Sequence, residues 1–251
     1  MKDPIYIPER EEMNGSGADC CLNLYSACNM RCTFCDVRTH RHSKMTAEEY
    51  AACTKPREGI LRALIYQLSK WKADGEPAHN VLLSPLCDPY PLIDDTTLTR
   101  SAIEVIHEYG HHVTILTRNP DPRDFDLLDD YDTYGVSLCC RIDLKDVYEP
   151  KAPAPVVRVA RMMMASMRSK CATMLYIAPL VDAQFAIDSI KHIDVNRYVI
   201  VRPRDGKLPV KGNVTDDELR ELVESKGRMI AFEHKRIWRK TDESNEIPDL
   251  K

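Results

Sequence analysis

Three cysteines stand close together near the N-terminus, in the stretch CNMRCTFCD at residues 28–36. Cys28, Cys32 and Cys35 are separated by three and then two residues, and no second C-x-x-C pair follows them. A structural zinc site usually takes four ligands as two close pairs, so zinc is the weaker interpretation. A cubane iron–sulfur cluster takes one ligand per iron, usually a thiolate. Three thiolates leave one iron open, which indicates a catalytic cluster that binds a substrate or cofactor.

The cysteines lie in a chain whose apolar pattern alternates between short strands and amphipathic helices. The pattern predicts strands at 20–25, 80–84, 112–116, 133–138, 172–177 and 197–201, and helices at 60–71, 96–109, 155–169, 183–191 and 216–226. Such alternation implies right-handed crossovers and a parallel sheet. We therefore expect an α/β fold, a partial (β/α)6 TIM-like barrel at residues 18–238. An N-terminal extension at 1–17 and a C-terminal tail at 239–251 complete the predicted organisation.

Polar segments follow the first four predicted strands. The cysteine loop follows the first strand directly, SPLCDPYPLID (84–94) follows the second, TRNPDPRD (117–124) the third, and SLCCRID (137–143) closes the fourth. The carboxyl ends of parallel barrel strands meet at one rim, where active sites of such barrels lie. The sequence therefore predicts that these segments converge on one site.

Composition excludes several classes of protein. The N-terminus has no apolar run typical of a signal peptide, and no run approaches the roughly 20 apolar residues of a membrane span. We therefore expect a cytoplasmic protein that spans no membrane and whose ten cysteines are reduced. The net charge of −4 gives no bulk attraction for nucleic acid. Basic stretches at 39–44, 202–207 and 233–240 are candidate phosphate contacts or simply solvated surface.

The cluster loop, C-x-x-x-C-x-x-C with Phe34 before its last cysteine, resembles that of the radical S-adenosylmethionine (SAM) superfamily. Four further segments are similar to the spore photoproduct lyase and DNA repair photolyase branch: CDPYPLID (87–94), RDFDLL (123–128), YEPKAPAPVVRVARMM (148–163) and YIAPLVD (176–182). The resemblance implies that Cys28, Cys32 and Cys35 hold a [4Fe–4S] cluster whose fourth iron binds SAM. It also implies reductive cleavage of SAM to a 5′-deoxyadenosyl radical, which abstracts hydrogen from a substrate carbon.

The same resemblance implies which residues contact the cofactor. Arg118 falls where the branch often carries a lysine that meets the SAM carboxylate, and Ser137 falls where a serine meets the cofactor. A guanidinium can bind a carboxylate through two hydrogen bonds, so the Arg118 assignment is chemically reasonable. A surface ion pair for Arg118 and a satisfied barrel hydroxyl for Ser137 are the alternatives. The full predicted cofactor set is Phe34, Ser84, Asp88, Arg118 and Ser137.

Cys87 and Tyr90 are the predicted catalytic residues. Spore photoproduct lyase carries a cysteine that returns hydrogen to the product radical, but it lies a few residues earlier relative to the shared aspartate. The weak S–H bond of a thiol suits that reaction, and the alternative for Cys87 is a plain buried cysteine. Tyr90 is a candidate to donate or relay hydrogen, and its alternative is packing beside Pro89 and Pro91.

Three classes of function remain open from the sequence. The first is a radical SAM enzyme, of lyase or isomerase type, that acts on a thymine base in DNA, by lesion repair or by rearrangement of a hypermodified base. The second is a radical SAM enzyme that modifies a peptide, protein or small metabolite. The third is a non-catalytic iron–sulfur or zinc protein. The first two need an electron donor such as flavodoxin or ferredoxin, and the first needs DNA as its partner.

Overall fold

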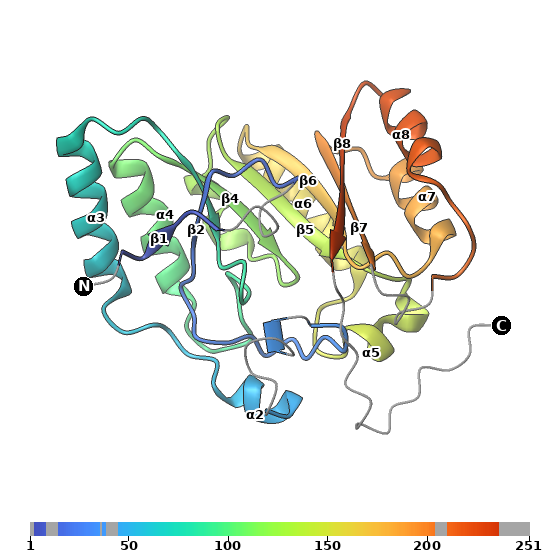
Figure 1. Ribbon diagram of the computed structural model, residues 1–251, viewed down its shortest axis with the longest axis horizontal. Coiled ribbons are helices and arrows are strands. Elements are labelled where there is room, and N and C mark those ends of the chain that lie inside the picture. Colours follow the sequence, from blue (N-terminus) through green and yellow to red (C-terminus); the bar gives the residue numbers. More distant parts are fainter. Residues whose placement is uncertain (1–2, 9–14, 36, 39–44, 204–209, 236–251) are drawn as a thin grey trace.

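The computed structural model describes residues 3–8, 15–35, 37–38, 45–203 and 210–235. Its centre is one sheet of eight strands, arranged in chain order and flanked by helices (Figure 1). β2 to β8 pair in parallel, each with the next, and β1 pairs with β2 in antiparallel orientation. The strands are β1 (Ile5–Tyr6), β2 (Cys20–Leu22), β3 (Asn80–Leu83), β4 (His112–Thr117), β5 (Thr133–Leu138), β6 (Ala172–Ile177), β7 (Arg197–Pro203) and β8 (Met229–Lys235).

This topology confirms the predicted α/β partial barrel, and all six predicted strands are present. The sheet also holds two strands that the sequence did not predict. β8 adds a seventh parallel strand, and its last three residues begin the stretch that was interpreted as basic. β1 belongs to the predicted N-terminal extension and joins the sheet through β2. The predicted C-terminal tail at 239–251 lies outside the described residues.

All five predicted helices are present, and two short helices, α2 and α5, were not predicted. The helices are α2 (Ala47–Ala52), α3 (Ile60–Asp74), α4 (Thr97–Glu108), α5 (Lys145–Tyr148), α6 (Pro155–Arg168), α7 (Ala183–His192) and α8 (Asp216–Glu224), with 3-10 turns at Pro122–Leu127 and Ile142–Leu144. The apolar stripe of α4 is buried through Ala102, Ile103 and Ile106, which explains its position against the sheet. α8 begins at a capping box in which Thr215 and Glu218 satisfy each other's backbone N–H groups.

Alternate strand residues face two different environments, as the pleat of a strand requires. Val81, Leu83 and Ile115 belong to the large core that includes the helices. A second, smaller cluster forms inside the barrel and includes Met174, Tyr176, Ala178, Val199 and Val201. This inner packing fills part of the barrel, and the cavities described below lie at the carboxyl ends of the strands.

The segment before β2 lies across the inner face of β7 and β8. Gly15 has a φ of +91°, and a Cβ there would lie 3.0 Å from both the Ala231 Cβ and the Val199 Cγ1. Only glycine tolerates that backbone conformation at so close an approach. Gly15 therefore brings the neighbouring Ser16 to the wall of the barrel cavity. Within the described part of the chain, no helix has both the length and the apolar character needed to cross a membrane.

Candidate functional site

The loop after β2 brings the three predicted cluster ligands together. Cys28, Cys32 and Cys35 line one cavity of about 120 Å³. The loop is fixed to the segment after β5, because the Thr33 N–H donates to the Tyr148 carbonyl at 3.0 Å. Packing also shields Cys32 from solvent, because this residue is 9 % exposed and belongs to a buried cluster with Met30 and Phe34.

Burial disfavours the thiolate forms of two of these cysteines. Burial raises the pKa of Cys32 to about 12 and that of Cys28 well above its usual value, so a metal must displace the thiol protons when it binds.

A second cavity, of about 150 Å³, adjoins the first inside the mouth of the barrel. It contains all five predicted cofactor residues in its wall, together with the predicted catalytic Cys87. The residues that line both cavities are Phe34, Pro85, Cys87, Asp88 and Arg118. The prediction that the polar segments converge on one rim is therefore confirmed, and the space beside the cysteines continues directly into the barrel.

Arg118 is held by a buried ion network. Its Nε donates to Glu149 Oε1 at 2.7 Å, and Arg158 donates to Glu149 Oε2 at 2.6 Å. The side chains of Glu149 and Arg158 are both fully buried. Burial alone would raise the pKa of Glu149, but the charges of Arg118 and Arg158 outweigh it and hold that pKa below its usual range. The surface ion pair that was the alternative for Arg118 is therefore wrong. The sequence analysis did not single out Glu149 and Arg158, although both lie in a segment quoted for the family resemblance.

The Arg118 guanidinium lies between the cysteine loop and the barrel cavity. Its Cζ is 5.4 Å from the centre of the Phe34 ring, and its Nη2 donates to the Ala178 carbonyl at 3.1 Å. These contacts fix a charge-assisted donor beside both cavities. The Arg118 guanidinium is therefore already oriented for hydrogen bonding to an anionic group that binds in either cavity.

Ser137 presents a buried hydroxyl to the barrel cavity. The residue is 1 % exposed, lines the cavity, and its Oγ has no hydrogen-bond partner among the residues that the structure describes. Leaving such a group unsatisfied costs about 1–3 kcal/mol, so the site fits a ligand that supplies a polar partner. The alternative, a hydroxyl satisfied within the barrel, is not what the structure shows.

Asp88 lines both cavities, and Ser84 lines the barrel cavity beside it. The Asp88 carboxylate accepts hydrogen bonds from the Tyr90 N–H at 2.9 Å, the Thr117 hydroxyl at 2.6 Å and the Arg118 N–H at 2.9 Å. Asp88 therefore ties the loop after β3 to the end of β4 and positions the backbone of Arg118. Ser84 has a φ of +57°, a left-handed conformation that turns the chain sharply after β3.

The Cys87 thiol lines both cavities. Its Sγ lies 3.5 Å from the Tyr25 carbonyl oxygen, to which the S–H can donate. Burial raises the pKa of Cys87 to about 11, so this sulfur keeps its proton at neutral pH. The structure thus presents an S–H group, and not a thiolate, at the junction of the two cavities.

Comparison with solved structures gives the relationship of the fold. Spore photoproduct lyase complexed with dinucleoside spore photoproduct superposes with a TM-score of 0.67 at 14% identity, covering 92% of this chain and 80% of that one. The chain has the fold of spore photoproduct lyase. A lyase variant with bound AdoMet and dinucleoside spore photoproduct gives a TM-score of 0.54 at 16% identity, over 86% of this chain and 64% of that one. No family model matches the sequence, and no curated protein matches it.

A peptide-binding protein shares the same architecture more distantly. Streptococcus suis SuiB bound to precursor peptide SuiA gives a TM-score of 0.52 at 13% identity, over 86% of this chain and 48% of that one. At these identities the comparisons establish the fold. The resemblance to spore photoproduct lyase drawn from the sequence is therefore confirmed at the level of architecture.

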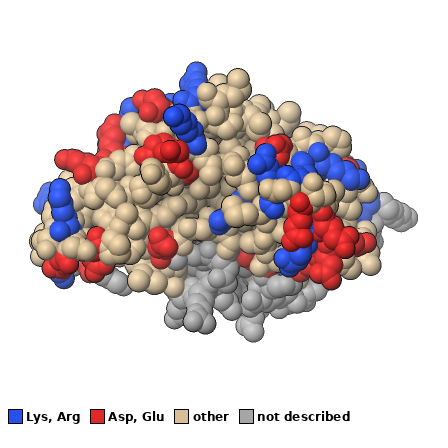
Figure 2. All heavy atoms as spheres, turned by 90° about the horizontal axis from the view of Figure 1, so that it is seen from above, with Lys and Arg blue, Asp and Glu red and all other residues tan. Residues whose placement is uncertain are grey.

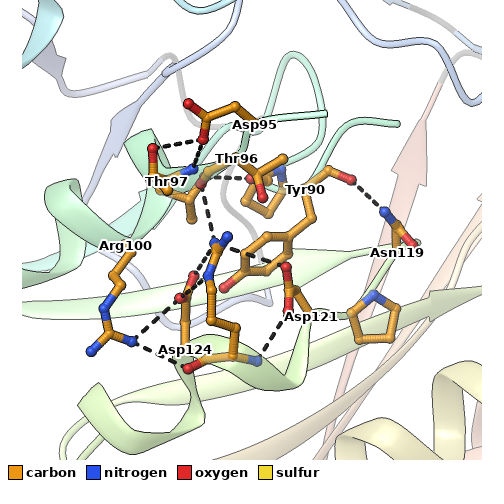
Figure 3. Close-up of polar contacts among 12 residues, drawn as sticks. Tyr90, Asp95, Thr96, Thr97, Arg100, Asn119, Asp121 and Asp124 are labelled. Carbon is orange, nitrogen blue, oxygen red and sulfur yellow. Dashed lines mark hydrogen bonds and ion pairs between the residues drawn. The ribbon is translucent and has the colours of Figure 1, made fainter. Parts of the chain in front are cut away.

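Tyr90 is the one predicted site residue that the lyase-like fold does not bring to the cavities. It is 1 % exposed, belongs to the large core, and is not among the described residues that line either cavity. Figure 3 shows its ring pointing toward Asp124, which Arg100 and Arg123 also contact. Its backbone carbonyl accepts from Asn119 Nδ2 at 2.9 Å. The structure therefore places the Tyr90 side chain in the core and outside the lining of both cavities, which favours the packing alternative for this residue.

The barrel cavity is also lined by a hydrogen-bonded tyrosine and glutamate that the sequence analysis missed. The Tyr176 hydroxyl donates to Glu233 Oε2 at 2.6 Å, and the two residues are 7 % and 5 % exposed. Both line the barrel cavity, beside Ser16 and Val201. The two residues are 57 positions apart in the chain, and Glu233 lies on the unpredicted strand β8, so no local motif could indicate the pair.

The structure describes only part of the basic stretches that were predicted as candidate phosphate contacts. Residues 39–44 lie outside the described part of the chain, as do most residues of 202–207 and 233–240. Within the described portion, Arg202 pairs with Asp216. Figure 2 shows Lys and Arg interspersed with Asp and Glu on the face that it presents. The bulk and local charges of this face therefore give no independent support for a nucleic-acid partner.

Proposed function

We propose that this protein is a radical SAM enzyme in which Cys28, Cys32 and Cys35 hold a [4Fe–4S] cluster. The observation that carries the proposal is the pair of adjoining cavities, one lined by the three thiols and the other by Arg118 and Ser137. The donor set fits the group: three thiols leave one position open, an oriented guanidinium suits the carboxylate of SAM, and an unsatisfied hydroxyl suits its polar groups.

When bound, the reduced cluster and SAM supply a 5′-deoxyadenosyl radical that abstracts hydrogen from a substrate carbon. The protein's own residues perform the remaining tasks. Arg118 binds and orients an anionic group, Glu149 and Arg158 hold Arg118 in place, and Phe34 covers the junction of the cavities. Cys87 holds hydrogen on its sulfur beside both cavities, where it can return it to a carbon radical.

For the substrate we propose a thymine base in DNA, repaired or rearranged at a carbon that the radical attacks. The likeness to a lyase complexed with dinucleoside spore photoproduct supports this choice. A base in a duplex would have to leave the stack to enter the barrel. The alternative substrate is a peptide, protein or metabolite, and the weaker likeness to SuiB bound to its precursor peptide supports it. Flavodoxin or ferredoxin is the proposed electron donor for either reaction.

Anaerobic reconstitution with iron and sulfide tests the proposal. The loaded protein is incubated with dithionite and SAM, with and without DNA, and 5′-deoxyadenosine is followed by mass spectrometry. We expect 5′-deoxyadenosine to form, to increase with DNA, and to be abolished in Cys32→Ala. Cys171→Ala is the matched control, because this buried thiol contacts Ser169 and lies away from both cavities. It should keep wild-type iron content.

The outcomes separate the parts of the proposal. Product that depends on the cluster but does not respond to DNA would keep the radical SAM chemistry and favour the peptide or metabolite alternative. A fully loaded cluster that yields no 5′-deoxyadenosine would overturn the catalytic interpretation and leave a non-catalytic iron–sulfur protein.

A further inference from the structure

Two adjacent cysteines follow β5, and their sulfur atoms are in contact. Cys139 and Cys140 come directly after Leu138, the last residue of that strand. The chain bends at Cys140, and the two Sγ atoms lie 3.4 Å apart. Both side chains are fully buried, and neither residue is among the described residues that line the two cavities. The proposed radical chemistry therefore leaves this pair of thiols without a role.

A second pair of adjacent cysteines shows that the bend, and not the dipeptide, brings these sulfurs together. Cys20 and Cys21 lie within strand β2, where successive side chains point to opposite faces of the sheet. Cys20 belongs to the large core, and its Sγ lies 3.9 Å from the Asn80 carbonyl oxygen. Cys21 pairs with Leu82, which lines the barrel cavity on the other face. The pair after β5 is thus arranged for chelation, and the pair in β2 is not.

A buried carboxylate lies within reach of both sulfurs after β5. The ligand atoms of Cys139, Cys140 and Glu149 all lie within 4.8 Å of one another, and all three residues are fully buried. Thiolates bind soft cations, and zinc accepts both thiolate and carboxylate ligands. Tetrahedral Zn–S bonds of about 2.3 Å place two sulfurs about 3.8 Å apart, so this pair would need to separate by only about 0.4 Å.

The neighbouring arginines are compatible with a cation at this place. Glu149 accepts one hydrogen bond from Arg118 and one from Arg158. A carboxylate offers about four lone-pair positions, so acceptor capacity remains for an ion. A divalent ion that binds both thiols forms two metal–sulfur bonds and releases two protons, so the net buried charge does not change. Arg118 also interacts electrostatically with Cys139, which favours the thiolate that the ion needs.

Another group of possible ligands differs in its chemistry. Among the described residues, the ligand atoms of His107, Asp129 and Asp132 also lie within 4.8 Å of one another. Asp132 already accepts from the Val113 and Asp129 N–H groups, and Asp129 is exposed. This group contains no sulfur, so an ion bound there would give no sulfur-to-metal charge-transfer absorption.

We propose that Cys139, Cys140 and Glu149 bind one thiophilic divalent cation of the zinc class, separately from the cluster cysteines. The site goes beyond the proposed function, because it requires neither SAM nor an iron–sulfur cluster. A bound ion links the end of β5 to the segment whose Tyr148 carbonyl accepts from the Thr33 N–H. It thereby joins two segments that support the cysteine loop.

Cadmium titration of the full-length chain tests this site. Cys28→Ala, Cys32→Ala and Cys35→Ala are combined to remove the competing thiols, and a phosphine keeps the other thiols reduced. We expect this triple variant to bind a single Cd²⁺ ion in equilibrium dialysis and to show an ultraviolet sulfur-to-cadmium charge-transfer band. Adding Cys140→Ala should weaken binding by at least about 100-fold and remove most of the band, because losing a ligand costs more than losing a ligand's hydrogen-bond partner.

Cys20→Ala in the same triple variant is the matched control. It also removes one buried thiol of an adjacent pair, and it should leave both the affinity and the band unchanged. Glu149→Gln keeps both thiols, so it should keep the band and weaken binding by about 10-fold. Circular dichroism establishes that each variant is folded before titration. If Cys140→Ala does not fold, Cys139→Ala takes its place, with the same expected result.

Several results would overturn the site. One is a folded triple variant that binds no cadmium, and another is cadmium binding without the charge-transfer band, which would place the ion at the His107 group. Binding and a band that both survive Cys140→Ala also overturn it. Unchanged affinity in Glu149→Gln would overturn the assignment of Glu149 as a ligand. None of these measurements involves 5′-deoxyadenosine, so failure of this site is distinguishable from failure of the proposed function.

Discussion

The two walls of the joined cavities are built in different ways. On the cysteine wall, the loops after β2, β3 and β4 supply the cysteines, Asp88 and Arg118, and each group comes from a short contiguous motif. On the barrel wall, strands β6 and β8 supply Tyr176 and Glu233, which are 57 positions apart and meet only because β6, β7 and β8 lie side by side in the sheet. The comparison teaches that local motifs of this chain indicate the residues of the cysteine wall, whereas the residues of the barrel wall are brought together by long-range strand order.

The largest expected effect is a loss of stability when Glu149, which pairs with two arginines beside the cysteines, loses its negative charge. Glu149 accepts from Arg158, which is fully buried, and from Arg118, which is 23 % exposed, so Glu149→Gln leaves both positive charges without their counter-charge. Breaking a buried ion pair in this way costs about 3–5 kcal/mol. We expect a loss of that size in the free energy of unfolding, measured by urea denaturation of the protein without cluster.

Glu104→Gln is the control for this change. Glu104 also pairs with an arginine, Arg100, at 3.2 Å, but its side chain is 51 % exposed. Exposed pairs contribute about 0–1 kcal/mol, so this variant should unfold nearly as the wild type does. Equal stability losses in Glu149→Gln and Glu104→Gln would contradict the view that buried charge organises the cysteine wall.

A second prediction concerns Cys87, which lines both cavities. If Cys87 returns hydrogen to the product radical, Cys87→Ala should still form 5′-deoxyadenosine, but the yield of final product per 5′-deoxyadenosine should fall to a small fraction. Both products are measured in the same anaerobic reaction by mass spectrometry. Cys53→Ala is the control, because Cys53 is an exposed thiol outside both cavities. An unchanged product ratio in Cys87→Ala would assign Cys87 to packing.

The sequence predicted the elements whose pattern is local. α4 begins and ends within one residue of its predicted bounds, because its apolar stripe and the following Gly110 define it. β8 was missed because its last three residues, Glu233 to Lys235, are polar and begin the stretch that was interpreted as basic. Partners across the sheet, and not residues within the strand, determine that this segment is a strand.

The same distinction applies to individual site residues. Cys87 and Tyr90 are three residues apart in one motif, yet one lines the cavities and the other lies in the core. The loop turns between them because Asp88 accepts from the Tyr90 N–H and from the end of β4. That turn depends on Thr117 and Arg118, which are far away in the sequence, so motif resemblance alone could not separate the two roles.

The smallest effect should come from Ser137, where stability and binding are expected to change in opposite directions. Its hydroxyl is buried without a partner among the described residues, so Ser137→Ala removes an unsatisfied group and should raise the free energy of unfolding of the cluster-free protein by about 1 kcal/mol or less. If that hydroxyl contacts SAM, the same change should weaken SAM binding to the loaded protein by about 2- to 10-fold, the value of one neutral hydrogen bond. Urea denaturation and equilibrium binding measure the two quantities separately. Gain of stability with unchanged SAM affinity would remove Ser137 from the predicted cofactor contacts.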